Sequence, residues 1–467
     1  MAIAILLGCR AVGAAEAGFA ETAAERDARM NWWREARFGM FIHWGLYAVP
    51  AKGEWHMCGA KVPGATYQGY AQQFNPVKWD ANAVVSLAKK AGMKYIVFTA
   101  KHHEGFAMWP TKVDGFNIFD ATPLKRDVLR ELKDACAKQG IKFGVYYSHG
   151  QDWNHPGGGV AGGRTWDPIQ KSDTFDNYAR RVAVPHCKEL LENYRPDLFW
   201  WDSSVYRWTD QNTPWMYDVF KPYLKTIILN NRWHDGLRSK QFESPEFFSE
   251  AKGIDHFVHG DYATPECHFP KSVPPDCLDW EACTSIKWHW GYHATDPRFQ
   301  SASYIVRSMV HCASQGGNFL LNIGPTAEGA IPQPSVERLE EVGRWMAVYG
   351  DSIYGTRGGP FYNVFENTGL GSGQDIPHQW SAITDFTRKD GKLFVHVYEL
   401  SANRTVTIPP LKSKVEGIHL LRDPKVAIPY TVKDGQIIAT VPVSVTPNPF
   451  DEVLVVATVG YPEGAQP

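Results

Sequence analysis

Short apolar segments alternate with helical segments along the first 350 residues, and this alternation restricts the fold more than any other feature. The apolar segments are rich in β-branched and aromatic residues and end in polar ones, as buried strands do. Strands separated by helices run parallel, so the pattern predicts a (β/α)8 barrel. A doubly wound sheet is the alternative, but its Gly-x-Gly-x-x-Gly fingerprint is missing. The expected strands cover residues 38–43, 94–100, 142–147, 197–202, 227–232, 256–259, 280–286 and 318–323, and the expected helices cover 82–90, 127–138, 173–192, 215–224, 302–314 and 336–349.

Beyond residue 354 the pattern changes to short β-rich runs without helices between them. Asp-Gly pairs at 390–391 and 434–435 separate several of these runs, and such pairs are typical of hairpin turns. We therefore predict a signal-like N-terminal segment over 1–30, a catalytic barrel over 31–352 and a C-terminal antiparallel β-sandwich over 353–467.

The fourth expected strand ends in the carboxylate Asp202, which follows four apolar residues and precedes two serines. Catalytic groups of an α/β barrel lie where strands end, so Asp202 is the candidate nucleophile. The Asp-Ser-Ser sequence also suits a helix N-cap, which is the structural alternative. Trp200 and Trp201 should point to opposite sides of this strand, one of them inward.

Other strand ends add polar side chains to the same face of the barrel. Two adjacent residues, His102 and His103, raise the alternative of a metal site. A catalytic zinc site needs three protein ligands, and no His-x-x-x-His or Glu-x-x-His pattern lies nearby. None of the eight cysteines forms a Cys-x-x-Cys pair either, so no metal site is predicted. The polar groups expected on this face are His43, His102, His103, Tyr147, Asp202, Asn230 and Arg232.

Glycoside hydrolysis fits this set of residues if a second carboxylate faces Asp202. Glu266 is the preferred candidate, because Pro265 stiffens its loop and Tyr262 can shield it and raise its pKa. Glu281 lies within a strand-like run and is expected to be a paired, structural carboxylate. The candidates considered are Glu243, Glu246, Glu250, Asp261, Glu266 and Glu281.

Composition narrows the choice of partner. The 18 tryptophans include more than an ordinary core needs and suggest a stacking surface for a sugar. A net charge of -2 provides no field that would attract nucleic acid or anionic lipid. No segment after the N-terminus approaches the roughly 18 consecutive apolar residues of a membrane span.

Residues 1–17 resemble the later part of a secretory signal, although no basic region precedes the apolar run. We therefore expect an exported protein, periplasmic or extracellular. Leu6-Leu7-Gly8-Cys9 loosely resembles a lipoprotein cleavage box, and anchoring at Cys9 is the less favoured alternative. In an exported protein, Cys267 could pair with Cys277 or Cys283.

Seven motifs in order resemble the α-L-fucosidases of glycoside hydrolase family 29, over residues 31–350. Each motif alone is weak, whereas the ordered set is specific. The motifs are Phe41-Ile42-His43-Trp44-Gly45, Glu54-Trp55, Lys101-His102-His103-Glu104-Gly105-Phe106, Phe199-Trp200-Trp201-Asp202, Asn231-Arg232-Trp233, Trp280-Glu281-x-Cys283 and 316–325.

The resemblance implies a retaining exo-α-L-fucosidase that hydrolyses terminal α-L-fucose from glycans and glycoconjugates by double displacement, without metal or organic cofactor. Asp202 matches the family nucleophile, and Glu266 is the position to which the acid/base role transfers. Trp290 resembles an aromatic residue near the methyl group of the sugar. The expected substrate-binding residues are His43, Glu54, Trp55, His102, His103, Tyr147, Trp200, Arg232 and Trp290.

Two other functions are compatible with the same residues. A related retaining glycosidase could act on β-D-galactosides, which share the ring stereochemistry of L-fucose apart from the methyl group. A non-catalytic fucose-binding protein could keep the barrel, because a fold does not guarantee a function. A homo-oligomer is compatible with each of these functions.

Overall fold

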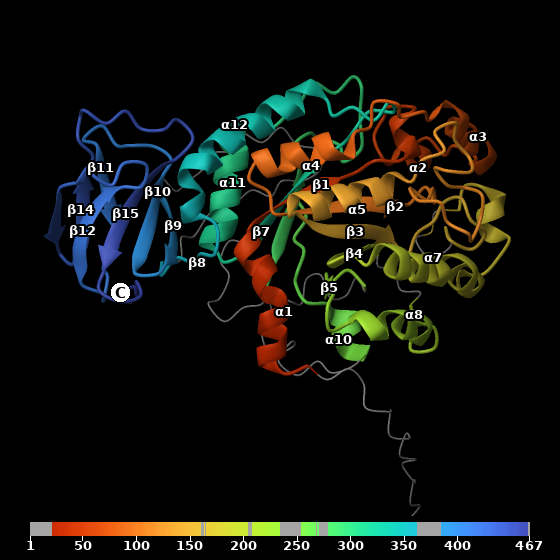
Figure 1. Cartoon of the computed structure of the whole chain (residues 1–467), viewed down its shortest axis with the longest axis horizontal. Coiled ribbons are helices and arrows are strands. Elements are labelled where there is room, and N and C mark those ends of the chain that lie inside the picture. Colours follow the sequence, from red (N-terminus) through yellow and green to blue (C-terminus); the bar gives the residue numbers. More distant parts are fainter. Residues whose placement is uncertain are drawn as a thin grey trace, which may run out of the picture.

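The chain forms a helix-covered parallel sheet followed by smaller antiparallel sheets (Figure 1). The computed structural model describes residues 21–159, 163, 165–203, 208–233, 254–267, 269, 279–361 and 384–465. Residues 1–20 with Cys9, the carboxylates Glu243, Glu246 and Glu250, and Cys277 lie outside these residues.

Seven parallel strands form the larger sheet, in the order β5-β4-β3-β2-β1-β7-β6. They are β1 (Phe38–Ile42), β2 (Tyr95–Lys101), β3 (Lys142–Ser148), β4 (Leu198–Asp202), β5 (Ile228–Leu229), β6 (Glu281–Ser285) and β7 (Asn318–Ile323). Strand β1 pairs with both β2 and β7. The outer strands β5 and β6 are linked through residues 261–267, so the sheet curls, which confirms the predicted barrel-like architecture.

Helices connect these strands and cover the outside of the sheet (Figure 1). A helical segment from Phe175 to Tyr194 contains two π-helical stretches around α7, and it replaces the single helix expected there. The helices are α2 (His56–Gly59), α3 (Gly64–Gln68), α4 (Ala81–Lys90), α5 (Val128–Gln139), α6 (Phe175–Tyr178), α7 (Val184–Glu189), α8 (Thr213–Phe220), α10 (Ile254–His259), α11 (Ala302–Ser314) and α12 (Gln333–Tyr349).

The sixth expected strand is wrong, because residues 256–259 belong to helix α10. The alternating polar and apolar residues there mimic a strand, but Phe257 packs in the helical layer against Trp233 and Phe220. Residues 261–267, which we call segment 6, occupy the sixth position instead. Parallel bridges join segment 6 to the chain after β5 (Asn230 with Tyr262) and to β6 (Ala263 with Trp280, Glu266 with Cys283), and they close the barrel.

Helix α1 (Ala23–Ala36) packs against the N-terminal ends of the strands. The side chain of Thr22 and that of Glu25 form a capping box at its start, and β1 begins two residues after its end. Met30 and Trp33 are buried in one apolar cluster with residues of the barrel interior, including Tyr262. This helix was not among the expected ones, and the expected barrel boundary at residue 31 falls inside α1.

The C-terminal residues form a five-stranded sheet, β12-β15-β10-β9-β8, and a three-stranded sheet, β11-β14-β13. One apolar cluster contains side chains from both sheets, such as Val395 and Ile437. The strands are β8 (Arg357–Gly358), β9 (Thr384–Lys389), β10 (Lys392–Val397), β11 (Thr405–Ile408), β12 (Val415–Leu420), β13 (Tyr430–Lys433), β14 (Gln436–Thr440) and β15 (Glu452–Thr458).

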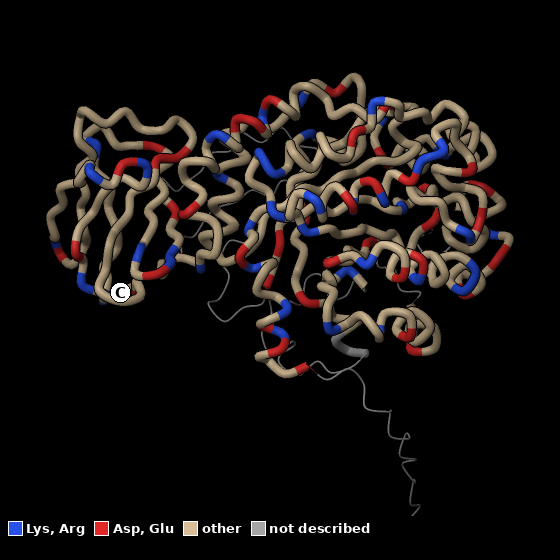
Figure 2. The backbone as a smooth tube through the Cα atoms, in the orientation of Figure 1, with Lys and Arg blue, Asp and Glu red and all other residues tan. Residues whose placement is uncertain are grey.

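Acidic and basic residues are interspersed along both parts of the chain (Figure 2). Among the described residues, no helix is both long and apolar enough to span a membrane.

Candidate active site

A cavity of about 290 Å³ opens at the C-terminal ends of the barrel strands. Strand alternation directs one side chain in two toward it, so several strands contribute to the lining. Carboxylates, a guanidinium group, imidazoles and indoles meet here, which is a set suited to a polar ring with one apolar face. The lining residues are Phe41, His43, Trp55, His102, His103, Tyr146, Gln151, Trp200, Asp202, Ser203, Arg232, Glu266, Cys283 and Trp290.

Asp202 ends β4 with its carboxylate in the cavity. The Tyr146 hydroxyl donates to Oδ2 at 2.8 Å and Arg232 Nη1 donates to Oδ1 at 3.0 Å. Ser203 adopts a left-handed conformation with φ of 61°, so the strand ends abruptly at this point. Tyr146 and Arg232 hold the carboxylate from the barrel interior. The residues that an N-cap at Asp202 would contact, 204–207, lie outside the described residues.

Glu266 lies opposite Asp202 and is joined to it through Arg232. Nη1 of Arg232 lies 3.0 Å from Asp202 Oδ1 and 2.8 Å from Glu266 Oε2. The two carboxylate oxygens therefore cannot be further apart than these two contacts laid end to end. That limit agrees with the roughly 5–5.5 Å of a retaining glycosidase and lies below the roughly 6.5–9.5 Å of an inverting one.

Arg232 is held by contacts on both sides of its guanidinium group. Its Nε donates to Thr264 Oγ1 at 2.8 Å, and the group stacks over the Trp200 ring at 4.3 Å. Burial would lower the pKa of Arg232, but the charges of Glu266 and Asp202 raise it. The guanidinium group therefore stays charged between the two carboxylates.

Three histidine rings line the wall next to Trp290. The centroids of His102 and His103 are 4.0 Å apart, and His43 lies 5.5 Å from His102. Burial and the neighbouring imidazoles lower the pKa of His43 and of His103 well below the usual value, so these rings are neutral. Neutral imidazoles can accept as well as donate hydrogen bonds, which suits sugar hydroxyls.

The orientation of His43 is set by Asn322 of β7. The amide nitrogen of Asn322 donates to the Ser285 hydroxyl at 3.0 Å and to the Trp290 carbonyl at 2.8 Å. Its oxygen is thereby directed at His43 Nδ1, 2.7 Å away, which must be the protonated nitrogen. Nε2 of His43 is then an acceptor for a ligand hydroxyl.

Glu54 and Trp55 come from the loop after β1 and have different surroundings. Trp55 lines the cavity and remains 40% exposed, with its ring 5.1 Å from His103. Glu54 is buried behind the cavity lining, where Oε2 accepts from the Gly291 amide at 2.8 Å. Burial raises the pKa of Glu54, and the hydrogen bond from the Gly291 amide opposes this effect. Glu54 is therefore a support for the cavity wall.

Tyr147 does not reach the cavity, and Tyr146 takes the place expected for it. Tyr146 pairs in register with Trp200 of β4, so both rings face inward. Tyr147 and Trp201 point to the helical layer, where the Tyr147 hydroxyl lies 3.1 Å from His186 Nδ1. The expected opposite directions of Trp200 and Trp201 are confirmed, and the same alternation identifies Tyr146.

The other candidate carboxylates lie away from Asp202 and Glu266. Glu281 is buried beneath the cavity floor, where the Trp200 indole nitrogen donates to it at 3.3 Å and the Tyr95 hydroxyl also donates. Burial raises the pKa of Glu281 to about 7. Asp261 pairs with Arg29 of α1 at 2.7 Å. Cys267 and Cys283 are both free thiols. Across the described ranges, no group of three or more potential ligands could hold a metal ion.

Comparison with known proteins gives one family. The α-L-fucosidase family matches residues 8–351. Human tissue α-L-fucosidase is 33% identical over 355 residues, which cover 70% of this chain and 69% of that protein. A putative α-L-fucosidase of Caenorhabditis elegans is 31% identical, with 70% of this chain and 67% of that protein covered.

Solved structures agree with this match over almost the whole chain. The α-L-fucosidase isoenzyme 1 of Paenibacillus thiaminolyticus has a TM-score of 0.78 and 32% identity. The matched region covers 93% of this chain and 100% of the Paenibacillus chain. A trapped covalent intermediate of a GH29 α-L-fucosidase from Bacteroides thetaiotaomicron, in complex with 2-fluoro-fucosyl fluoride, has a TM-score of 0.76 and 26% identity. The matched region covers 96% of this chain and 99% of the Bacteroides thetaiotaomicron chain.

Proposed function

The chain belongs to the α-L-fucosidase family of glycoside hydrolases, and we propose that it releases terminal α-L-fucose from oligosaccharides and glycoconjugates with Asp202 as nucleophile and Glu266 as acid/base. The observation that carries this assignment is the shared contact of Arg232 Nη1 with both carboxylates. It keeps them at the short separation that double displacement requires.

In the first step, Asp202 Oδ attacks the anomeric carbon while Glu266 protonates the departing glycosidic oxygen. The C1–O bond to the leaving group breaks, a C1–O bond to Asp202 forms, and the sugar configuration inverts. In the second step Glu266, now a carboxylate, removes a proton from water as the water attacks C1 and Asp202 leaves. The two inversions return the original configuration.

The surrounding residues fit the shape and polarity of a 6-deoxyhexose. His43 and His103 offer neutral ring nitrogens to the hydroxyl groups, His102 adds a third ring to the same wall, and Trp55 lies at the open side. Phe41, Trp200 and Trp290 form an apolar wall that suits the methyl group and one ring face. Tyr146 and Arg232 hold the Asp202 carboxylate in position for attack.

An Asp202→Gly variant tests the nucleophile. We expect activity on an aryl α-L-fucoside to fall by about four orders of magnitude or more, because the covalent step is lost. Azide should restore part of it by entering the vacated space, and the product should be the β-fucosyl azide by NMR. Asp197→Gly is the matched control, since Asp197 lies at the other end of the same strand in a half-exposed pair with Lys142. Full activity of the Asp202 variant would refute the assignment.

A Glu266→Ala variant tests the acid/base. A leaving group that departs readily as an anion needs little protonation, so an aryl α-L-fucoside should retain far more activity than a fucosyl disaccharide. An equal loss on both substrates would exclude Glu266 as the acid. Turnover of the matching aryl β-D-galactoside, measured in parallel, tests the sugar specificity.

Export is a separate part of the proposal and rests on the signal-like residues 1–17. We expect the protein made in its native host to lack this segment. The mass of the intact mature protein measures this directly, and a full-length chain retained in the cell would contradict it.

A further inference from the structure

The barrel has a weak seam between β5 and segment 6. Strand β5 contains only two residues, and its neighbour pairs through isolated bridges. Two main-chain hydrogen bonds join the two sides within the described residues, from the Asp261 amide to the Leu229 carbonyl and from the Asn231 amide to the Tyr262 carbonyl. A seam with so few bonds leaves the offset between its two sides poorly determined by the backbone alone.

The seam also carries a central part of the catalytic machinery. Arg232 follows β5 on one side, and Glu266 lies near the end of segment 6 on the other. Their 2.8 Å contact crosses the seam, as do the bonds from Arg232 to Thr264. A small slide of one side along the other would therefore change the position of Glu266 relative to Arg232 and Asp202.

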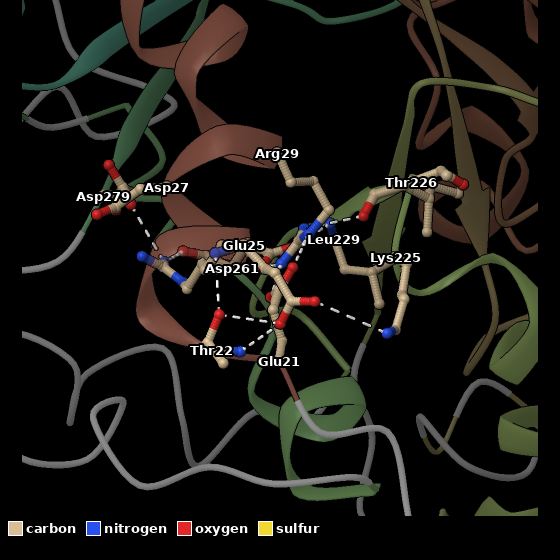
Figure 3. A network of polar contacts seen from close by, with 12 residues as sticks. Glu21, Thr22, Glu25, Asp27, Arg29, Lys225, Thr226, Leu229, Asp261 and Asp279 are labelled. Carbon is tan, nitrogen blue, oxygen red and sulfur yellow. Dashed lines mark hydrogen bonds and ion pairs between the residues drawn. The ribbon is translucent and has the colours of Figure 1, made fainter.

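Arg29 of α1 holds the other end of this seam (Figure 3). Its Nη1 donates to the Ile227 carbonyl, before β5, at 3.0 Å and to Asp261 Oδ2, at the start of segment 6, at 2.8 Å. Asp261 Oδ2 accepts in turn from the Leu229 amide at 2.9 Å. A single guanidinium group thus joins both sides of the seam.

The contact between Arg29 and Asp261 is buried and joins two nitrogens of the guanidinium group to the two carboxylate oxygens. Arg29 Nη2 lies 2.7 Å from Asp261 Oδ1 and 2.6 Å from Glu21 Oε2, and the Asp261 side chain is fully buried. Burial would lower the pKa of Arg29, but Asp261 and Glu21 raise it, so the pair is charged. A planar two-point contact of this kind constrains position more than a point charge does.

We infer that Arg29, at the end of the barrel opposite the cavity, is a positioning residue for the acid/base Glu266. It fixes segment 6 against β5, and the extended backbone from Asp261 transmits that offset to Glu266. The inference rests on the proposed acid/base role of Glu266. Proton transfer depends on sub-ångström placement, so a small slide at the seam should impair the acid before it unfolds the barrel.

The test compares Arg29→Lys with Arg34→Lys in the full chain. Lysine keeps a positive charge for Asp261 but cannot reach Ile227, Asp261 and Glu21 at once. Arg34 lies on the same helix and makes an equivalent two-point contact, at 2.7 Å, with Asp279 at the start of β6. Its substitution loosens the helix without releasing the seam. Both variants, the wild type and Glu266→Ala are assayed on an aryl α-L-fucoside and on a fucosyl disaccharide.

We expect Arg29→Lys to lose about 10-fold or more in kcat/KM on the disaccharide and less than about 3-fold on the aryl substrate, as a weaker form of the Glu266→Ala pattern. The basic limb of its pH–rate profile should also move, which a general loss of folded protein would not cause. Arg34→Lys should show neither effect. If Arg29→Lys does not fold, Arg29→Met combined with Asp261→Asn and Glu21→Gln removes the three charges of the cluster and keeps an acceptor for the Leu229 amide.

An equal loss on both substrates by the Arg29 variants, or a selective loss in Arg34→Lys as well, would overturn the inference. Absence of selectivity in Glu266→Ala would instead show that the acid/base proposal is wrong. The two failures are therefore distinguishable within one set of assays.

Discussion

Two adjacent tyrosines of β3 have different surroundings, because the Tyr146 hydroxyl donates to Asp202 in the cavity whereas Tyr147 contacts His186 in the helical layer. His43, His102, His103, Trp200, Asp202, Arg232, Glu266 and Trp290 all line one cavity, as strand ends suggested. Tyr147 does not, because adjacent tyrosines on β3 face opposite sides and no sequence feature distinguished them. The pairing of Tyr146 with Trp200 decides the choice, and that register is a property of the folded sheet.

The two tyrosines provide a matched pair for mutation. Tyr146→Phe removes the 2.8 Å hydrogen bond to the Asp202 carboxylate, and bonds to charged groups contribute roughly 1.5–3 kcal/mol. We expect kcat on an aryl α-L-fucoside to fall about 10- to 100-fold. Tyr147→Phe removes hydroxyl contacts with His186 and Tyr178, which lie away from the cavity, so it should keep kcat and lose a little stability. The opposite ranking of the two variants would show that the carboxylate is not held by Tyr146.

At the element scale, the long, strongly apolar strands were predictable and the short ones were not. Strand β4 consists of four apolar residues followed by Asp202, and this pattern differs clearly from the flanking sequence. Segment 6 pairs only through isolated bridges and includes Pro265, so its strand character depends on β6 beside it. Helix α1 has a polar exterior and was missed, although its Thr22 and Glu25 form a recognisable capping box.

The loop after β3 is a second element whose order depends on buried charge. His155 lies 2.9 Å from both Asp114 and Asp152, and Lys101 lies 3.1 Å from Asp152. The same loop supplies Gln151 to the cavity wall, and its Trp153 packs against the wall residue Trp55. Burial would lower the pKa of His155, but the two carboxylates raise it to about 9.

This pKa predicts a defined pH dependence of stability. The folded state keeps the His155 proton up to about pH 9, whereas the unfolded chain releases it near 6.5. Folding therefore binds a proton between these values, and stability falls as pH rises through them. A His155→Gln variant lacks this dependence, so its deficit relative to wild type should be largest below pH 6.5 and shrink by up to about 3 kcal/mol by pH 9.

Chemical denaturation at a series of pH values measures this deficit. His186→Gln is the control, because burial lowers the pKa of His186 to about 3 and its titration affects stability only at acidic pH. A deficit for His155→Gln that stays constant from pH 6 to 9 would contradict the charged state of His155.

At the scale of the whole molecule, the barrel and the five-stranded sheet share a core. Side chains of β10 alternate between two clusters, with Phe394 packed in the barrel cluster together with Trp345 of α12, and Val395 in the sheet's own cluster. Polar contacts cross the same interface, since Ser314 donates to Asp385 at 2.8 Å and the Trp345 indole donates to the Asp451 carbonyl at 3.0 Å. Two parts joined in this way should unfold together.

Phe394→Ala tests that coupling at a position in the C-terminal sheet, on the strand β10. Deleting a buried phenylalanine costs about 3–5 kcal/mol, which for a chain of this length lowers the thermal midpoint by roughly 3–5 °C. Because the cluster is continuous with the barrel, hydrolysis of an aryl α-L-fucoside should be lost at the same lowered temperature. Val432→Ala, at a position 63% exposed on β13, should leave both unchanged. The coupling would be contradicted by two calorimetric transitions of which Phe394→Ala shifts only one, with activity lost at the other. The barrel would then be stable without the sheet.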